Sequence, residues 1–252
     1  MTIGNNKDRH GMRLVGPEDI PKSDSSAENS SLEEKIKILE KKLEEANAKI
    51  EKLEKDPVTE LFKFNVLEEK LNDSIEKLNF EKKEGKEQRP PIYAVVLMAL
   101  DLDNLKEWNK YGHPVGDEAL RTLANSLRAA TKEEDRIFRR GDKSDEIVIV
   151  MEIGKDLSDE FIQKQIFERV KSVANNGFIE IGEGENKKKE PVTASVECII
   201  IRPGGLKNVT EILSVVDAKQ VKDKNNPENK QERINKARKA LGLPLIEEDY
   251  SI

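Results

Sequence analysis

The chain has 252 residues, and with 37% of them charged against 36% hydrophobic it is too polar to be one globular domain from end to end. The formal net charge of −6 argues against a basic protein that binds a nucleic-acid polymer. The single cysteine, Cys198, excludes an internal disulfide and a cysteine-based zinc site. We therefore expect one domain of ordinary size with extended segments attached to it.

The uninterrupted apolar stretches are short. The longest, Tyr93 to Leu100, falls well below the roughly 20 residues that a membrane-spanning helix needs. No hydrophobic core of a signal peptide follows Met1. The sequence therefore predicts a cytoplasmic protein without a membrane partner.

The N-terminal part of the chain reads as a tail followed by a coiled coil. Residues 1–30 are rich in Gly, Pro, Ser, Asn and charge and have no apolar periodicity, which is typical of a disordered tail. Residues 31–55 carry apolar side chains at alternating spacings of three and four, with Ile36, Leu43 and Ile50 at position a and Leu32, Leu39, Ala46 and Leu53 at position d. Ile at a with Leu at d favours a parallel dimer. A single solvated helix is the alternative interpretation, because only about three heptads are present.

Residues 56–228 read as a mixed α/β domain. Asp56 and Pro57 interrupt the coiled coil, and apolar residues from Leu61 to Leu78 then follow helical spacing. The remaining predicted helices cover about 104–110, 116–131, 162–173 and 209–222, and the predicted strands cover 92–101, 136–139, 146–151, 177–181 and 192–201. This order predicts an α/β fold with a central sheet covered by helices. Residues 229–252 are expected to form a C-terminal helical extension.

Carboxylates stand where two of the predicted strands meet their loops. Asp101 closes the apolar strand 92–101, at the carboxyl end where ligand crevices of open α/β sheets form. Asp145 and Glu146 open the strand after the predicted hairpin turn, so they face the same end of the sheet if the two strands are neighbours. Burying such groups is costly unless a cation meets them, and their hard oxygens suit Mg²⁺ bound to substrate phosphates. Simple surface caps are the alternative.

Four stretches of the chain between about Asp56 and Lys224 match short sequence motifs. AspProValThrGluLeu at 56–61 is similar to Asp-x-Leu-Thr-Gly-Leu, AspLeuAspAsnLeuLysGluTrpAsn at 101–109 to Asp-x-Asp-x-Phe-Lys-x-x-Asn, GlyHisProValGlyAspGluAlaLeu at 112–120 to Gly-His-x-x-Gly-Asp-x-x-Leu, and ArgArgGlyAspLysSerAspGluIleValIle at 139–149 to Arg-x-Gly-Gly-Asp-Glu-Phe and its strand. The four together, in order and at similar distances, are far more specific than any one of them. Together they resemble the motifs of the GGDEF family, the diguanylate cyclases.

The resemblance implies a palm-like nucleotidyl-cyclase domain that works as a homodimer. Each subunit would bind one GTP with Mg²⁺ or Mn²⁺, and two facing subunits would join two GTP into cyclic di-GMP. By position, Asp101, Asp145 and the main-chain carbonyl of Leu102 would hold the metal. Glu146 would help deprotonate the attacking ribose 3′-hydroxyl or hold a second metal.

The same resemblance assigns residues to the substrate. Asn109 and Asp117 would recognise the guanine edge, although a C-cap for Asn109 and an N-cap for Asp117 are the alternatives. Lys224 stands where the family has a phosphate-binding Lys, and a solvated Lys is equally compatible with the pattern. Main-chain N–H groups at the start of a helix would cradle phosphates, from Asn104, Leu105 and Lys106.

The chain also departs from the family pattern. GlyAspLysSer at 141–144 replaces Gly-Gly and makes the signature turn two residues longer. Glycines in that turn permit positive φ and close approach of the backbone to the nucleotide. One residue is missing between Asn109 and Gly112, and the feedback motif Arg-x-x-Asp is represented only by Lys132 and Asp135. Lys lacks the bidentate fork of Arg, so we expect no product inhibition there.

The sequence is therefore compatible with two functions. The first is a Mg²⁺-dependent enzyme that joins two GTP and is made competent by coiled-coil dimerisation; the retention of Asp101, Asp145 and Glu146 favours it. The second is a GGDEF-like module without catalysis, which binds a nucleotide or a protein partner and signals through the coiled coil. The altered signature turn favours this second function.

Overall fold

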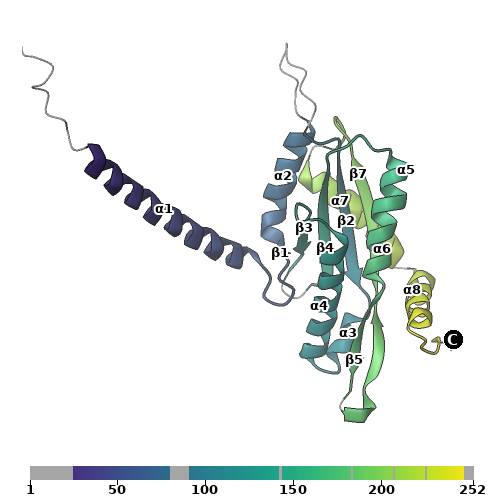
Figure 1. The fold of residues 1–252 in the computed structure, drawn as a ribbon. Helices are drawn as coiled ribbons and strands as arrows, with labels where there is room; N and C mark the ends of the chain where they lie inside the picture. The colour runs from purple at the N-terminus through teal and green to yellow at the C-terminus, as the bar shows by residue number, and fades with distance from the viewer. Residues whose placement is uncertain are drawn as a thin grey trace, which may run out of the picture. The chain divides into compact units, whose positions relative to one another are not determined.

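The structure is a computed structural model and describes residues 25–79, 91–141, 144–182, 184–206, 208–224 and 226–246 (Figure 1). It divides into two units, residues 1–51 and residues 52–252. Most of the tail predicted for residues 1–30 lies outside the described residues. Within the part of the chain that is described, no helix is long and apolar enough to cross a membrane.

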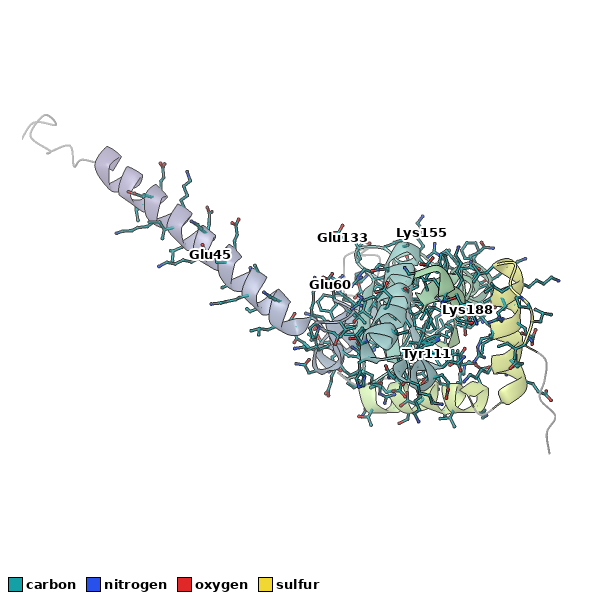
Figure 2. All side chains as sticks on the ribbon, turned by 90° about the horizontal axis from the view of Figure 1, so that it is seen from below. Glu45, Glu60, Tyr111, Glu133, Lys155 and Lys188 are labelled. Carbon is teal, nitrogen blue, oxygen red and sulfur yellow. The ribbon has the colours of Figure 1, made fainter. Side chains whose placement is uncertain are left out.

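The first unit contains helix α1, Ser25–Glu54, which extends into the second unit and starts before the predicted coiled coil at residue 31. Its side chains project outward around the helix, as Glu45 does in Figure 2. The Leu and Ile residues at the heptad positions are between 52% and 70% exposed in this single chain, namely Leu32, Ile36, Leu39, Leu43, Ile50 and Leu53. The helix thus carries the predicted row of apolar a and d residues, called the seam below. The parallel dimer stays a prediction.

A tight turn opens the second unit. The carboxylate of Asp56 accepts hydrogen bonds from the N–H and the hydroxyl of Thr59, at 2.8 and 2.7 Å, and Glu60 adopts a positive φ of 57°. Strand β1 (Phe62–Lys63), a 3₁₀ turn (Phe64–Val66) and helix α2 (Leu67–Leu78) follow. The helix predicted from Leu61 therefore begins later than expected, because the turn places Leu61 and the strand ahead of it.

The central sheet has the strand order β1-β3-β4-β2-β7. Its longer strands are β2 (Ala94–Leu102), β3 (Arg136–Arg139), β4 (Glu146–Ile153) and β7 (Ala194–Ile201). The pairings among these four strands are antiparallel, whereas the short β1 pairs with β3 in parallel. The predicted hairpin is confirmed as β3 and β4, and β4 is the direct neighbour of β2.

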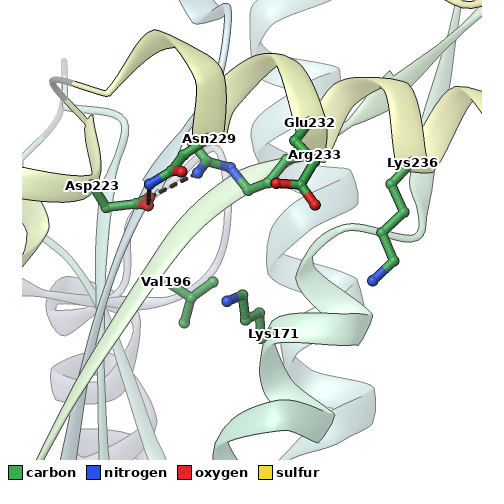
Figure 3. Close-up of a pocket in the computed structure, with 7 residues that line it drawn as sticks. All are labelled: Lys171, Val196, Asp223, Asn229, Glu232, Arg233 and Lys236. Carbon is green, nitrogen blue, oxygen red and sulfur yellow. Dashed lines mark hydrogen bonds and ion pairs between the residues drawn. The ribbon is translucent and has the colours of Figure 1, made fainter.

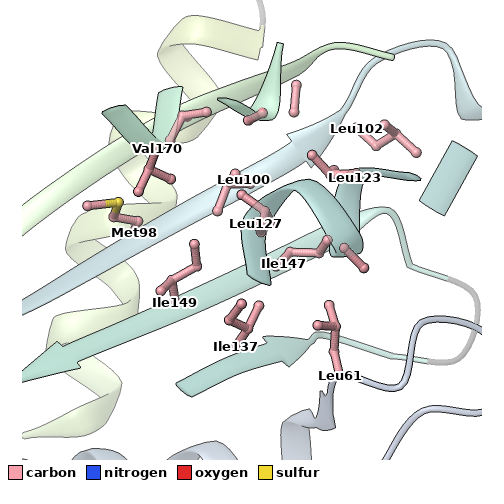
Figure 4. Close-up of a cluster of buried hydrophobic side chains, with 14 of the residues drawn as sticks. Leu61, Met98, Leu100, Leu102, Leu123, Leu127, Ile137, Ile147, Ile149 and Val170 are labelled. Carbon is pink, nitrogen blue, oxygen red and sulfur yellow. The ribbon is translucent and has the colours of Figure 1, made fainter. Parts of the chain in front are cut away.

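Helices cover both faces of this sheet, which is why all nine residues of β2 are buried. On one face, even-numbered β2 residues such as Met98 and Leu100 pack with α4 (His113–Ala130) and α6 (Glu168–Ala174) (Figure 4). On the other face, odd-numbered residues such as Leu97 pack with α2 and α7 (Val209–Lys224). This confirms the predicted α/β fold with a helix-covered central sheet.

Shorter elements complete the domain. Helix α3 (Leu105–Asn109) follows β2. Helix α5 (Asp159–Phe161) and a π-helical segment (Ile162–Phe167) precede α6. A 3₁₀ turn (Gly184–Asn186) joins strand β5 (Gly177–Ile181) to strand β6 (Lys188–Val192). Strands β5 and β6 form their own two-stranded sheet. The single strand predicted over 192–201 is therefore divided at Thr193, whose carbonyl accepts the N–H of Asp103 at 2.9 Å.

The C-terminal helix is α8, Pro227–Ala240. The Asn226 side chain caps it by accepting the N–H groups of Glu228 and Asn229. Its buried residues are Ile234 and Ala237, and Arg238 binds Glu190 of β6 at 2.7 Å. The predicted extension thus includes a helix that packs on the domain.

Candidate functional site

Three polar residues form one row across three neighbouring strands. Asp101 of β2 lies directly opposite Glu146 of β4 on one side and Ser195 of β7 on the other. Residues directly opposite in antiparallel strands share a face, with Cβ atoms about 4.5–5.5 Å apart. Asp101 and Ser195 are only 4% and 2% exposed. The row therefore brings two carboxylates and a hydroxyl together at one end of the sheet.

The row lies on the face that α7 covers. Ala99 of β2 and Val148 of β4, each two positions away from the row, belong to the core cluster that includes α7. Arg140, just after β3, donates to both carboxylate oxygens of Asp217 on α7 at 2.7 and 2.8 Å, and it lies 3.3 Å from Glu146. The hydrogen bond to Asp217 chiefly, with the charges of both carboxylates, raises the pKa of Arg140. Arg140 is therefore a permanent cation beside Glu146.

The register separates the two acidic residues of the signature strand. Neighbouring residues of an extended strand point to opposite faces, so only one of Asp145 and Glu146 shares the face of Asp101. The pairing assigns that position to Glu146. Asp145 precedes β4, and its main-chain carbonyl accepts the N–H of Leu102 at 3.2 Å. The predicted metal ligands Asp101, Leu102, Asp145 and Glu146 are thus all at one strand end.

The altered signature turn is described only at its ends, since residues 142 and 143 lie outside the described residues. Ser144 closes the turn: its N–H donates to the Gly141 carbonyl at 3.0 Å, and its hydroxyl accepts the N–H of Glu146 at 3.1 Å. Arg139 donates to the Ser144 carbonyl at 3.1 Å and to both oxygens of Asp56 at 3.0 Å. Arg139 therefore connects the base of the turn to Asp56, at the N-terminal end of the domain.

Asp103, two residues beyond Asp101, has polar partners of its own. The Thr193 hydroxyl donates to it at 2.8 Å, and Arg233 of α8 donates to its two oxygens at 3.1 and 3.3 Å. Asn104 follows in the left-handed region with a φ of 63° and begins α3. Leu105 is buried and Lys106 is exposed. The three residues predicted to cradle phosphates thus form the turn into a helix of only five residues.

The predicted guanine-binding residue Asn109 lies against the first turn of α4. A Cβ built on Gly116 would lie 2.1 Å from Oδ1 of Asn109, so the Asn109 side chain occupies the space over Gly116, the residue before Asp117 in the chain. Asp117 lies inside α4, which begins at His113 with Gly112 at the N-cap position, so the N-cap alternative for Asp117 is wrong. Lys110, not Asn109, is the C-cap of α3. Lys224 ends α7, but its side chain lies outside the described residues.

The donor set can be tested against Mg²⁺. Among the described residues, no three His, Cys, Asp or Glu side chains converge as a metal site. Mg²⁺, however, is usually bound by one or two carboxylates together with substrate phosphates rather than by an all-protein cage. Asp101 and Glu146 supply two carboxylates, and the buried Ser195 hydroxyl has no hydrogen-bond partner within the described part of the chain. These residues fit a metal that arrives with its nucleotide.

Several residues around the site were not predicted from the sequence. The sequence predicts Ser195 only as part of the strand 192–201, and its polar side chain between Ala194 and Val196 is the available signal. Arg139 corresponds to the Arg of the signature motif, and the sequence gives no role to the neighbouring Arg140. Asp217 and Arg233 contact the site from helices far along the chain, and no spacing in the sequence indicated it.

The sequence of this chain is similar to a known protein family. Residues 53–230 match the family model described as diguanylate cyclase, GGDEF domain. DgcS of Shewanella oneidensis and DgcZ of Escherichia coli, both named diguanylate cyclases, are 40% identical over 60 residues and 39% identical over 61 residues. Each match covers about a quarter of this chain, 23% and 24%, and 20% of the relative. The chain thus spans only a fifth of these relatives' length.

Solved structures agree in fold. The coiled coil and GGDEF domain of DgcB from Caulobacter crescentus, in complex with c-di-GMP, has a TM-score of 0.57 at 16% identity, with 79% of this chain and 93% of that chain covered. The diguanylate cyclase SiaD from Pseudomonas aeruginosa, in complex with its activator SiaC, has a TM-score of 0.52 at 23% identity, with 79% and 75% covered. Because the family model spans most of the chain and the fold agrees, this chain belongs to the GGDEF family.

Proposed function

We propose that the protein is a diguanylate cyclase, which joins two GTP into cyclic di-GMP with Mg²⁺ or Mn²⁺. The observation that supports this most is the row of Glu146, Asp101 and Ser195 at one end of the central sheet. Carboxylates that face one another at the end of a buried strand supply hard oxygen ligands for a divalent metal that substrate phosphates also bind. A nucleotide would bring such a metal to the row. GTP as the substrate agrees with the predicted cytoplasmic location.

The residue roles in this proposal are those that the resemblance to the family implies. Asp101 and Glu146, with the carbonyl of Leu102 and the neighbouring Asp145, would hold the metal, which when bound neutralises charge on the phosphates. Glu146 is the less buried of the two carboxylates in the row and would accept the proton of the attacking 3′-hydroxyl. Asn109 and Asp117 would bind the guanine edge. Asn104, Leu105 and Lys106, with Lys224, would contact phosphates.

Joining two nucleotides requires two such sites to face each other. We propose that the seam of α1 pairs with the same seam of a second copy, because its Ile and Leu residues are more than half exposed in the single chain. Such a tether raises the effective concentration of the second site to roughly millimolar. Dimerisation would then control activity without a change in the site itself.

The test is to incubate the purified full chain with GTP and Mg²⁺ and to separate the products by chromatography. Cyclic di-GMP should form with the wild type and not with Asp145→Ala or Asp101→Asn. Parallel incubation with ATP determines whether the product is specific to guanine. If the wild type binds GTP and yields no cyclic dinucleotide, the protein is not a cyclase.

A second candidate function is a GGDEF module that binds nucleotide or a protein partner without catalysis. The observation that favours it is Arg140, which already pairs with Glu146 at 3.3 Å and thereby occupies one of the two carboxylates of the row. In that case Arg140, rather than a metal, compensates Glu146. GTP binding that does not depend on Mg²⁺ and gives no product would support this second function.

A further inference from the structure

Arg233 of the C-terminal helix reaches back to the strand end that carries the proposed metal ligands. Its Nη2 and Nε donate to the two carboxylate oxygens of Asp103 at 3.1 and 3.3 Å, and its Nη1 donates to Asp223 at 2.7 Å. The side chains of Arg233 and Asp103 are 12% and 7% exposed. Figure 3 shows Arg233 beside Asp223 and Asn229, along a cavity of about 240 Å³. The contact is therefore a largely buried, two-pronged ion pair.

Asp103 lies at the strand end that carries Asp101. It follows Asp101 and Leu102 in the chain, and its own N–H is bound by the Thr193 carbonyl at 2.9 Å. The next residue, Asn104, has a φ of 63°, in the left-handed region that is uncommon outside glycine although Asn adopts it more readily than most residues. The fork of Arg233 on Asp103 is one of the contacts that fix this turn.

Other residues also hold α8 on the domain. Ile234 and Ala237 of α8 are buried, and Arg238 binds Glu190 of β6 at 2.7 Å. Arg238 is also 12% exposed, so α8 carries two arginines of equal burial, and only Arg233 contacts the strand end. Arg233 also lies beyond residue 230, where the match to the family model ends.

We propose that Arg233 is a positioning residue, which holds Asp103 and thereby the strand end that presents Asp101 and the carbonyl of Leu102 to the nucleotide. This inference rests on the proposed function for its consequence, GTP binding, but the positioning itself is a property of the protein without nucleotide. A Lys at this position would keep the charge and lose the fork. Partners that orient metal ligands in this way typically affect metal affinity or activity by about 10- to 100-fold.

The test compares Arg233→Gln with Arg238→Gln in the full chain. Amide hydrogen exchange, measured without nucleotide, should become faster over residues 101–106 in Arg233→Gln and stay at the wild-type rate in Arg238→Gln. The dissociation constant of a fluorescent GTP analogue with Mg²⁺ should rise about 10-fold or more in Arg233→Gln only. A purely structural role of α8 predicts equal effects of the two variants.

A second variant guards against misfolding, because Arg233→Gln leaves Asp103 and Asp223 without their cation. Arg233→Lys retains the charge, so it should keep the wild-type melting temperature while exchange over residues 101–106 still rises. Unchanged exchange there in both Arg233 variants would overturn the inference. Wild-type protein that binds no GTP would instead overturn the proposed function, and the exchange measurement would still decide whether Arg233 positions the strand end.

Discussion

Arg140 binds Asp217 through both of its terminal nitrogens, at 2.7 and 2.8 Å, and this pairing limits how much of its charge is available to Glu146. Asp217 lies on α7 and Glu146 on β4, so the helix and the sheet share one cation. Glu146 competes with Asp217 for Arg140, and in the proposed enzyme a metal competes with Arg140 for Glu146.

Replacing Asp217 should therefore weaken metal-dependent binding. In Asp217→Ala, Arg140 is released to pair with Glu146, and a partly exposed ion pair contributes up to about 1 kcal/mol, so GTP affinity with Mg²⁺ should fall about threefold to fivefold. Arg140→Gln removes the competitor and should leave that affinity equal or higher. Calorimetric titration of both variants checks this; equal affinity in Asp217→Ala and the wild type would show that Arg140 does not compete for Glu146.

A methyl group at Gly116 should disturb base recognition and spare the fold. The added Cβ would lie 2.1 Å from Oδ1 of Asn109, so the Asn109 side chain has to move. Ala is favoured over Gly inside a helix by about 1 kcal/mol, so the melting temperature of Gly116→Ala should not fall much. GTP affinity should fall while ATP affinity stays unchanged, as competition binding can show. Retained preference for GTP would mean that Asn109 does not bind the guanine.

The buried pair of Asp56 and Arg139 should make the domain sensitive to acid. Burial raises the pKa of Asp56, but hydrogen bonds from Thr59 and Arg139 together with the charge of Arg139 outweigh it, so the pKa lies below the ordinary value of 3.8. The folded state therefore holds this proton less tightly than the unfolded state. Its contribution to stability is complete above about pH 4 and is lost as the pH falls through the lowered pKa.

Thermal unfolding between about pH 6 and pH 2.5 checks this prediction. Wild type should lose stability more steeply below about pH 4 than Asp56→Asn, which has no carboxylate to protonate. At neutral pH, Asp56→Ala should cost about 3–5 kcal/mol because it leaves Arg139 buried without its partner. Parallel acid profiles of the wild type and Asp56→Asn would contradict the assignment.

The two strands that carry the site could be predicted because local patterns determined them. The apolar run that ends at Asp101 and the hairpin before Glu146 each predicted a strand, whereas the sequence left open whether the two strands are neighbours, and the structure places them side by side. What the motifs left open was which acidic residue faces Asp101. Which residue faces Asp101 depends on the register of the pairing between β2 and β4. A change of register by one residue moves every side chain of a strand to the other face of the sheet.

The contacts from distant helices could not be predicted. Arg233 meets Asp103 across 130 positions and Arg140 meets Asp217 across 77, and which turn of α7 or α8 reaches the strand end depends on how the whole helix packs. The start of α2 was missed for a different reason. Leu61 and Phe64 fit its apolar spacing, but the hydrogen-bonded turn at Asp56 and the positive φ of Glu60 keep this stretch out of the helix.

Removal of the first unit tests the proposed role of the seam. A chain that begins at Lys52 retains both core clusters, so it should fold, and light scattering should report a monomer. At low protein concentration its cyclase activity should be about 100-fold below that of the full chain, because the tether no longer supplies a high effective concentration. Activity should recover as protein concentration rises. Full activity of the dilute truncated chain would show that the seam does not assemble the site.

The most direct test of the central claim compares two glutamates of β4. Glu146 and Glu152 are 33% and 30% exposed and share one face of the strand, but only Glu146 lies opposite Asp101, whereas Glu152 binds Ser74 and Lys77 of α2. Cyclic di-GMP formation from GTP and Mg²⁺ should fall about 100-fold or more in Glu146→Gln and remain near the wild-type rate in Glu152→Gln. Equal product formation by Glu146→Gln and the wild type would contradict the claim that this row of the sheet is the site of catalysis.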